Sequence, residues 1–162
     1  MKKYVLSNIL ALCLFAFVNS GFEGLWMMND EKFMIHITKA DDGEYKGYVD
    51  WLKYPVYPEG DKEAGVQQYD RNNSKEELRD RKIIGLQNVG ELYKNKKGKL
   101  TGGWVYDTWN GNKYYGSAKL IDENTLSLKG SIDKWGILGY AMKAKRVDNP
   151  KKYFAKHVTH HE

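Results

Sequence analysis

Two arginines, Arg79 and Arg81, flank Asp80 in a polar stretch and are the side chains of this chain best suited to bind an anion. A guanidinium presents a planar fork of N–H donors that matches a carboxylate or a phosphate group. We expect these arginines at the mouth of a binding site, where they would hold the charged head of a ligand. The alternative is a structural role, in which either arginine pairs with Asp70 or Asp107 and fixes the polar stretch to the rest of the domain.

Side chains that commonly carry catalysis are sparse. Cys13 is the only cysteine, no Gly-x-Ser-x-Gly motif occurs, and His36 is the only histidine before the C-terminal tail. Three aspartates, Asp50, Asp70 and Asp107, could supply a carboxylate pair, but nothing in their spacing brings two of them together. We therefore predict that the protein is not an enzyme and needs no cofactor.

Three histidines lie close to the C-terminus, at positions His157, His160 and His161. On a helix they would share one face, where a metal ion such as zinc or nickel could bind. The segment 148–162 is rich in lysine and lies at the end of the chain, which favours a basic, solvated tail without a metal. Tyr153 and Phe154 could still dock part of this tail onto the domain.

Several segments of the chain, described below, alternate between apolar and polar residues as β-strands do. A set of mostly aromatic side chains falls on the apolar face of these segments. The set predicted to line the interior is Phe33, Ile35, Tyr45, Trp51, Trp104, Tyr106 and Tyr114. An apolar wall with a few hydroxyl groups suits a ligand whose tail contacts apolar surface and whose head meets a tyrosine or an arginine. For each residue taken singly, packing in a core is the simpler role, so the ligand hypothesis concerns the set.

Segments of alternating polarity recur from Gly24 onward and predict an all-β domain. After a first strand at Gly24, the predicted strands cover residues 32–38, 44–52, 82–89, 91–94, 100–107, 113–121, 125–132 and 137–147. Turn signals such as Asn110-Gly111 join most of them, so up-and-down pairing is the simplest topology. One apolar face with little helix to cover it requires closure, which predicts an antiparallel barrel of eight or nine strands over residues 21–147. A two-sheet sandwich is the alternative.

The alternation breaks after residue 52. Residues 53–77 contain prolines, glycines and many charges, which predicts a long loop that leaves the barrel. Ser74 followed by Glu77 forms a capping box, so we predict one short helix over residues 75–81 within this loop.

The N-terminal segment has the pattern of an export signal. Lys2 and Lys3 precede an apolar run over residues 9–18. Val18 and Ser20, at the two positions that a signal peptidase reads, have side chains of small or moderate size. We predict that residues 1–20 are a cleaved signal peptide and that the mature chain is periplasmic or secreted, without stable membrane insertion. A retained anchor, or a lipoprotein modified at Cys13, is the alternative. Loss of the two lysines lowers the formal net charge from +5 to +3, which gives no support for a nucleic-acid partner.

Two sequence patterns resemble known families. Gly24-Leu25-Trp26 together with Arg146 resembles the lipocalin and calycin pattern, in which the arginine packs over the tryptophan ring where the barrel closes. The stretches Asp70-Arg71-Asn72-Asn73, Leu78-Arg79-Asp80-Arg81, Ile84-Gly85-Leu86 and Gly102-Gly103-Trp104-Val105-Tyr106-Asp107 resemble a family of small exported bacterial domains of unknown function with lipocalin-like folds. The resemblance implies a lipocalin-like barrel closed by Gly24, Trp26 and Arg146.

These observations lead to two functional hypotheses. In the first, the protein is an exported binding protein that holds a small lipophilic or amphipathic, fatty-acid-like ligand inside the barrel. In that case Trp104→Ala should change ligand affinity more than Trp26→Ala.

In the second hypothesis the barrel is filled, and the loop over residues 53–81 binds an envelope or host protein. Exposed tyrosines at Tyr54, Tyr57 and Tyr69 would suit such an interface. The sequence leaves the oligomeric state open.

Overall fold

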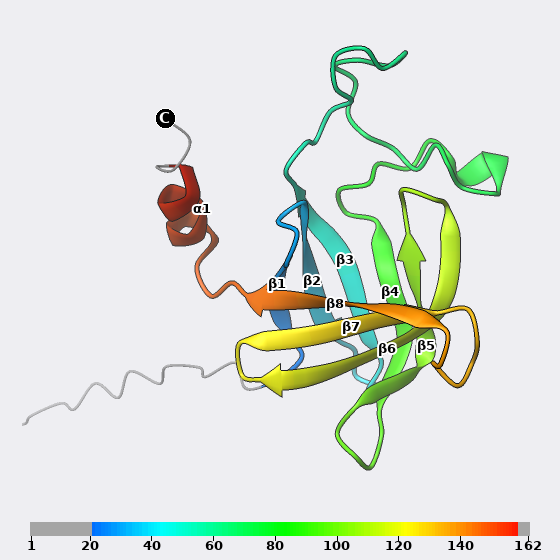
Figure 1. Ribbon diagram of the computed structural model, residues 1–162, viewed down its shortest axis with the longest axis vertical. Coiled ribbons are helices and arrows are strands. Elements are labelled where there is room, and N and C mark those ends of the chain that lie inside the picture. Colours follow the sequence, from blue (N-terminus) through cyan, green and yellow to red (C-terminus); the bar gives the residue numbers. More distant parts are fainter. Residues whose placement is uncertain (1–20, 159–162) are drawn as a thin grey trace, which may run out of the picture.

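Eight antiparallel strands close into a barrel in the computed structural model, which describes residues 21–158 (Figure 1). The strands are β1 (Gly24–Met28), β2 (Phe33–Lys39), β3 (Tyr45–Leu52), β4 (Gln87–Lys94), β5 (Leu100–Asp107), β6 (Asn112–Asp122), β7 (Thr125–Ser131) and β8 (Gly139–Arg146). Each strand pairs with the next along the chain, and β8 pairs with β1. The predicted up-and-down barrel is confirmed, and the sandwich alternative is wrong.

Some of the predictions concern residues that the structure does not describe. The proposed signal peptide at residues 1–20, which contains Cys13, and the histidines His160 and His161 lie outside the described part. Within residues 21–158, no helix has the length and apolar character needed to cross a membrane.

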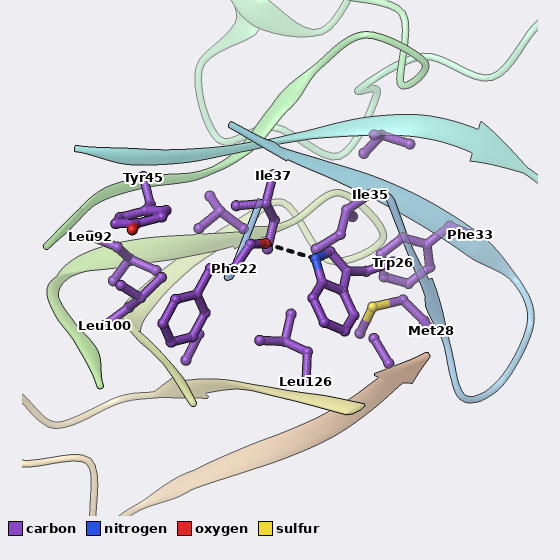
Figure 2. Close-up of a cluster of buried hydrophobic side chains, with 14 of the residues drawn as sticks. Phe22, Trp26, Met28, Phe33, Ile35, Ile37, Tyr45, Leu92, Leu100 and Leu126 are labelled. Carbon is purple, nitrogen blue, oxygen red and sulfur yellow. Dashed lines mark hydrogen bonds between the residues drawn. The ribbon is translucent and has the colours of Figure 1, made fainter. Parts of the chain in front are cut away.

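Trp26 seals one end of the barrel, which we call the closed end (Figure 2). Its side chain is fully buried, and its indole N–H donates a hydrogen bond of 2.8 Å to the carbonyl of Phe22. The guanidinium of Arg146 lies 4.2 Å from the centre of the Trp26 ring and donates to the carbonyl of Gly21. Gly24 opens β1 with a positive φ of 116°, a conformation that glycine adopts readily. The predicted contact between arginine and tryptophan is confirmed.

A core of buried apolar side chains fills the closed half of the barrel (Figure 2). It includes Phe22, Met28, Ile35, Ile37, Tyr45, Val49, Leu92, Leu100, Ala118, Leu126 and Ala144. The alternation of β2 shows how the sequence produces this core, since Ile35 and Ile37 are buried whereas His36 between them is exposed.

A β-bulge in β3 turns Trp51 away from the interior. Met34 pairs with Trp51 and the next residue, Ile35, pairs with Val49, so Asp50 is an extra residue in β3. One extra residue moves the following side chain to the other face of the sheet. Trp51 therefore lies on the outer face, and its predicted inward orientation is wrong.

A second bulge, in β5, has the same effect on Trp104. The register shifts between Leu100 and Gly103, and Gly102 has a φ of 90°. Val105 then packs against the core, whereas the ring of Trp104 covers Gly90 from outside. The predicted inward orientation of the Trp104 ring is wrong for this reason, and the hydroxyl of Tyr106 is directed to Asp70 of the connection between β3 and β4.

The connection between β3 and β4 is the long loop at the top of Figure 1, and it runs over residues 53–86. We call it the β3–β4 loop. The sequence predicts two strands here, over residues 82–89 and 91–94. The structure has one strand, β4, and residues 82–86 belong to the loop, so the predicted pair is wrong. Gly85 and Leu86 instead make backbone hydrogen bonds with Val49 of β3.

The helix in the β3–β4 loop is a short 3-10 turn, η1 (Glu76–Leu78), rather than the predicted helix over residues 75–81. Ser74 does not cap it, because the N-cap position is occupied by Lys75, which makes no side-chain capping bond. Asn73 organises the turn instead. Its side-chain oxygen accepts from the backbone N–H of Lys75, and its carbonyl accepts from Nε of Arg79.

After β8 the chain forms a helix, α1 (Pro150–Val158). Pro150 is favoured at a first helical position, and the side-chain oxygen of Asn149 accepts from the backbone N–H of Lys152. The ring of Phe154 lies 4.9 Å from that of Trp51, on the outer face of the barrel. Residues 150–158 thus form a helix that docks on the barrel through Phe154, the possibility that the sequence left open, while Lys151 and Lys152 remain exposed.

Candidate functional site

A cavity of about 620 Å³ occupies the end of the barrel opposite Trp26, which we call the open end. The connections β1–β2, β5–β6 and β7–β8 surround its mouth. Its inner wall is apolar and is formed largely by Met28, Phe33, Val105, Tyr114, Leu128 and Met142. The barrel is therefore filled at its closed end and hollow at its open end.

Asn88 places an amide group in this apolar wall. The register of β3 and β4 shifts so that Gly47 pairs with Val89 and Tyr48 pairs with Gln87, which leaves Asn88 as an extra residue. Its side chain lines the cavity and is only 7% exposed. Its Oδ1 atom has no hydrogen-bond partner among the described residues. A buried acceptor without a donor is unfavourable, so this atom lowers the stability of the barrel.

The mouth of the cavity carries an aromatic ring and a few charges. Trp109, in the β5–β6 turn, packs its ring 5.2 Å from that of Phe33 and remains half exposed. Asp30 and Lys32 come from the β1–β2 turn, and their charged atoms are 4.0 Å apart. Asp107 also lines the mouth and accepts from the backbone N–H of Trp109. This arrangement offers a ligand an aromatic surface and charges of both signs.

The structure divides the predicted ligand-binding residues into three groups. Phe33 and Tyr114 line the cavity, as the alternation predicts. Ile35 and Tyr45 are buried in the core, where the Tyr45 ring meets that of Phe22 edge-on at 5.7 Å. Tyr106 at the end of β5 also borders the cavity, although its hydroxyl bonds Asp70. The third group consists of Trp51, Trp104, Arg79 and Arg81, whose side chains have other partners.

Arg79 and Arg81 do not reach the cavity and have the structural role that the sequence left open. Nη2 of Arg81 lies 2.6 Å from Oδ2 of Asp70, which is fully buried. The hydroxyl of Tyr106 donates to Oδ1 of the same carboxylate at 2.6 Å. Burial and the contact with Asp70 raise the pKa of Tyr106 to about 12. Together these groups fix the β3–β4 loop to β5.

The β3–β4 loop is further held by its own contacts. Tyr57 is buried, and the guanidinium of Arg71 lies 3.9 Å from the centre of its ring. Arg71 also pairs with Asp61 at 2.7 Å, which lowers the pKa of that carboxyl to about 2. The hydroxyl of Tyr69 hydrogen-bonds Glu63. Tyr57 is therefore not available as an exposed interface residue, which weakens the second functional hypothesis.

A second, more polar pocket of about 410 Å³ lies outside the barrel, between the β3–β4 loop and the β5–β6 hairpin. Trp104 contributes its indole ring, and Nζ of Lys113 lies 3.8 Å from the centre of that ring. The indole nitrogen of Trp104 is buried and has no hydrogen-bond partner in the part of the chain that the structure describes. Trp104 thus belongs to this outer pocket.

The cavity residues that the sequence analysis missed include Asn88 and Trp109. Asn88 faces inward only because of a bulge, and the residue types in β4 do not predict where a bulge falls. Trp109 lies in a turn, where alternation says nothing about orientation. The described residues contain no group of three or more His, Cys, Asp or Glu side chains placed to bind a metal ion. His157 belongs to α1, and the other two histidines of the predicted cluster lie outside the described part.

Comparisons with known proteins agree with this fold. A family model described as an uncharacterised protein conserved in bacteria, DUF2147, matches residues 24–146. The chain is also similar in structure to protein HP1028 from the human pathogen Helicobacter pylori, whose title assigns it to the lipocalin family. The two chains are 22% identical, with a TM-score of 0.67 over 83% of this chain and 88% of that one, a likeness that concerns the fold alone. No curated protein matches this sequence.

Proposed function

The chain belongs to the DUF2147 family of uncharacterised proteins conserved in bacteria, and we propose that it binds one small lipophilic or amphipathic molecule inside its barrel. The observation that carries this proposal is the cavity of about 620 Å³, whose largely apolar wall also contains Asn88. Binding sites for small molecules typically have volumes of about 300–1,000 Å³, apolar walls and a few polar groups. The cavity has all three properties, which supports a binding role rather than a catalytic one.

The lining residues limit the chemistry of the ligand. Met28, Phe33 and Leu128 would contact an apolar body, and the amide-bearing side chain of Asn88 is a polar group in the same wall. Lys32 is the one cation among the described residues that line the cavity. A fatty-acid-like ligand would therefore place its carboxylate at Lys32, which takes over the role that the sequence analysis gave to Arg79 and Arg81.

Displacement of a fluorescent lipophilic probe tests this function. Leu128→Trp adds an indole ring to the cavity wall and should weaken probe binding by at least about tenfold, since the ring occupies ligand volume. Ile121→Trp is the matched control, because Ile121 is exposed near the end of β6 and does not line the cavity. Equal binding by wild type and Leu128→Trp would show that the probe binds elsewhere.

We also propose that the protein acts in the periplasm or is secreted. The support is the sequence pattern of residues 1–20, in which Lys2 and Lys3 precede an apolar run. A small lipophilic molecule needs a carrier in such an aqueous compartment, so this location is compatible with the proposed binding role.

A further inference from the structure

The β7–β8 loop, residues 132–138, exposes a cluster of large apolar side chains. The loop projects from the barrel as the orange turn on the right of Figure 1. Trp135 and Ile137 are 75% and 76% exposed, and Ile132, Leu138 and Tyr140 are also largely exposed. Single exposed apolar side chains are ordinary, but a contiguous patch of this kind marks a surface that binds something.

The loop is held in a defined conformation by its own polar groups. The carboxylate of Asp133 accepts backbone hydrogen bonds from Trp135, Ile137 and Leu138 at 3.0, 3.0 and 2.5 Å. These bonds lower the pKa of Asp133. Nζ of Lys129 donates to the carbonyl of Gly136 at 2.6 Å. The tip therefore presents apolar side chains while these backbone groups are already paired, which reduces the cost of moving it out of water.

We infer that this loop docks the protein reversibly onto the surface of a lipid bilayer. Tryptophan and tyrosine are favoured at the boundary between headgroups and acyl chains, and Trp135 and Tyr140 lie at this loop. The loop and its base carry Lys129 and Lys134 against the acid Asp133, whose carboxylate is occupied by backbone N–H groups. A positive charge beside exposed apolar side chains is complementary to a membrane that contains anionic lipids.

Lys134 occupies the position that such docking requires. Its Nζ atom lies 4.9 Å from the centre of the Trp135 ring, so the cation and the indole are at the same tip. A lysine beside an interfacial tryptophan can contact lipid phosphates while the ring enters the headgroup region.

Docking would also bring the mouth of the cavity to the membrane. Ile132, Leu138 and Tyr140 belong to the loop or its base and also line the cavity. A lipophilic ligand could then pass between bilayer and barrel without crossing bulk water. This consequence rests on the proposed function, whereas the docking itself does not.

Vesicle flotation tests the inference. The full chain, processed by the cell that makes it, is mixed with vesicles of phosphatidylcholine and phosphatidylglycerol in equal parts, and with vesicles of phosphatidylcholine alone. We expect wild type to float with the vesicles, more strongly with those that contain phosphatidylglycerol. The double variant Trp135→Ser/Ile137→Ser should lose at least about tenfold in vesicle binding, because it removes two apolar side chains from the interface. Brominated lipids should quench wild-type fluorescence more than that of the variant.

The matched control is Tyr93→Ser/Ile121→Ser, which removes two exposed apolar side chains from β4 and β6. It should bind vesicles as wild type does. Equal binding by wild type and by the loop variant would overturn the inference, as would no binding of wild type to either vesicle. A dimer in analytical ultracentrifugation that the loop variant abolishes, without vesicle binding, would assign the patch to a second copy and also overturn it.

Failure of docking and failure of ligand binding are distinguishable. Trp135 and Ile137 do not line the cavity, so the loop variant should bind the lipophilic probe in solution as wild type does. Because both side chains are exposed, its thermal midpoint should also be unchanged, which shows that it folds.

Discussion

Two asparagines with nearly equal burial should respond in opposite directions to the same substitution. Asn88 and Asn73 are 7% and 6% exposed. Oδ1 of Asn88 has no hydrogen-bond partner among the described residues, whereas Asn73 donates to Asp70 and Tyr106 and accepts from the backbone of Lys75. We predict that Asn88→Leu stabilises the unliganded protein and that Asn73→Leu destabilises it.

The magnitudes follow from the contacts. An unpaired buried polar group costs about 1–3 kcal/mol, so Asn88→Leu should raise the free energy of unfolding by about 1–2 kcal/mol after some loss from repacking. Asn73→Leu removes a bond to a buried carboxylate as well as two weaker bonds, and should lower it by about 2–4 kcal/mol. For a domain of roughly 140 residues, about 1 kcal/mol corresponds to about 3–4 °C in the thermal midpoint.

Differential scanning calorimetry of the ligand-free protein measures both effects. We expect the midpoint to rise by about 3–8 °C for Asn88→Leu and to fall by about 6–16 °C for Asn73→Leu. Asn73→Leu serves as the control, because the Asn73 amide has its hydrogen-bond partners within the chain. A clear loss of stability in Asn88→Leu would refute the reasoning, because it would show that the amide is satisfied in the unliganded protein.

Three further predictions concern the closed end, the β3–β4 loop and the N-terminus. In urea titrations, Trp26→Ala should lower the free energy of unfolding by about 3–5 kcal/mol. Trp104→Ala should lower it by less, since Trp104 lies on the outer face. The reverse ranking would contradict the structure. The pKa of Tyr106, raised to about 12, means that its stabilising contribution is complete below pH 10 and is lost as the pH rises towards 12. Between pH 10 and pH 12 the thermal midpoint of Tyr106→Phe should therefore decrease less than that of wild type. An equal decrease in both proteins would count against the contact between Tyr106 and Asp70. Intact mass of protein recovered from its source cells should correspond to a chain that begins at Gly21, and a mass that includes residues 1–20 would exclude the proposed cleavage.

The strands and their closure could be predicted from the sequence because they depend on local patterns. The alternation of residues 33–37 and the turn at Asp42 and Gly43 have clear physical causes, since Gly43 has a φ of 88° and the side chain of Asp42 accepts from the backbone of Glu44. The pairing of Arg146 with Trp26 follows from the resemblance and is present in the structure.

The orientation of several side chains could not be predicted, because it depends on bulges. An extra residue at Asp50 moves Trp51 to the outer face, and another beside Gly102 moves Trp104. A bulge inverts the alternation without any change in residue type, so the aromatic wall proposed from the sequence includes residues from both faces. Gly102 offers the one local signal, since its positive φ favours glycine.

The sequence named Asp70 as a possible partner of Arg79 or Arg81, but it could not decide between this structural role and ligand binding. Asp70 is buried only when the β3–β4 loop folds back onto β5, where Tyr106 meets it. Arg81 binds a carboxylate of the same chain, Asp70, whereas Arg79 donates to the carbonyl of Asn73.

Native mass spectrometry of the protein purified gently from its source cells tests the central proposal most directly. The cavity at the open end predicts one small lipophilic or amphipathic molecule per chain, carried by wild type and by Ile121→Trp but lost or strongly reduced in Leu128→Trp. A wild-type spectrum that contains only the mass of the unliganded chain, or a ligand that Leu128→Trp retains in full, would contradict the proposal that the barrel is a binding site.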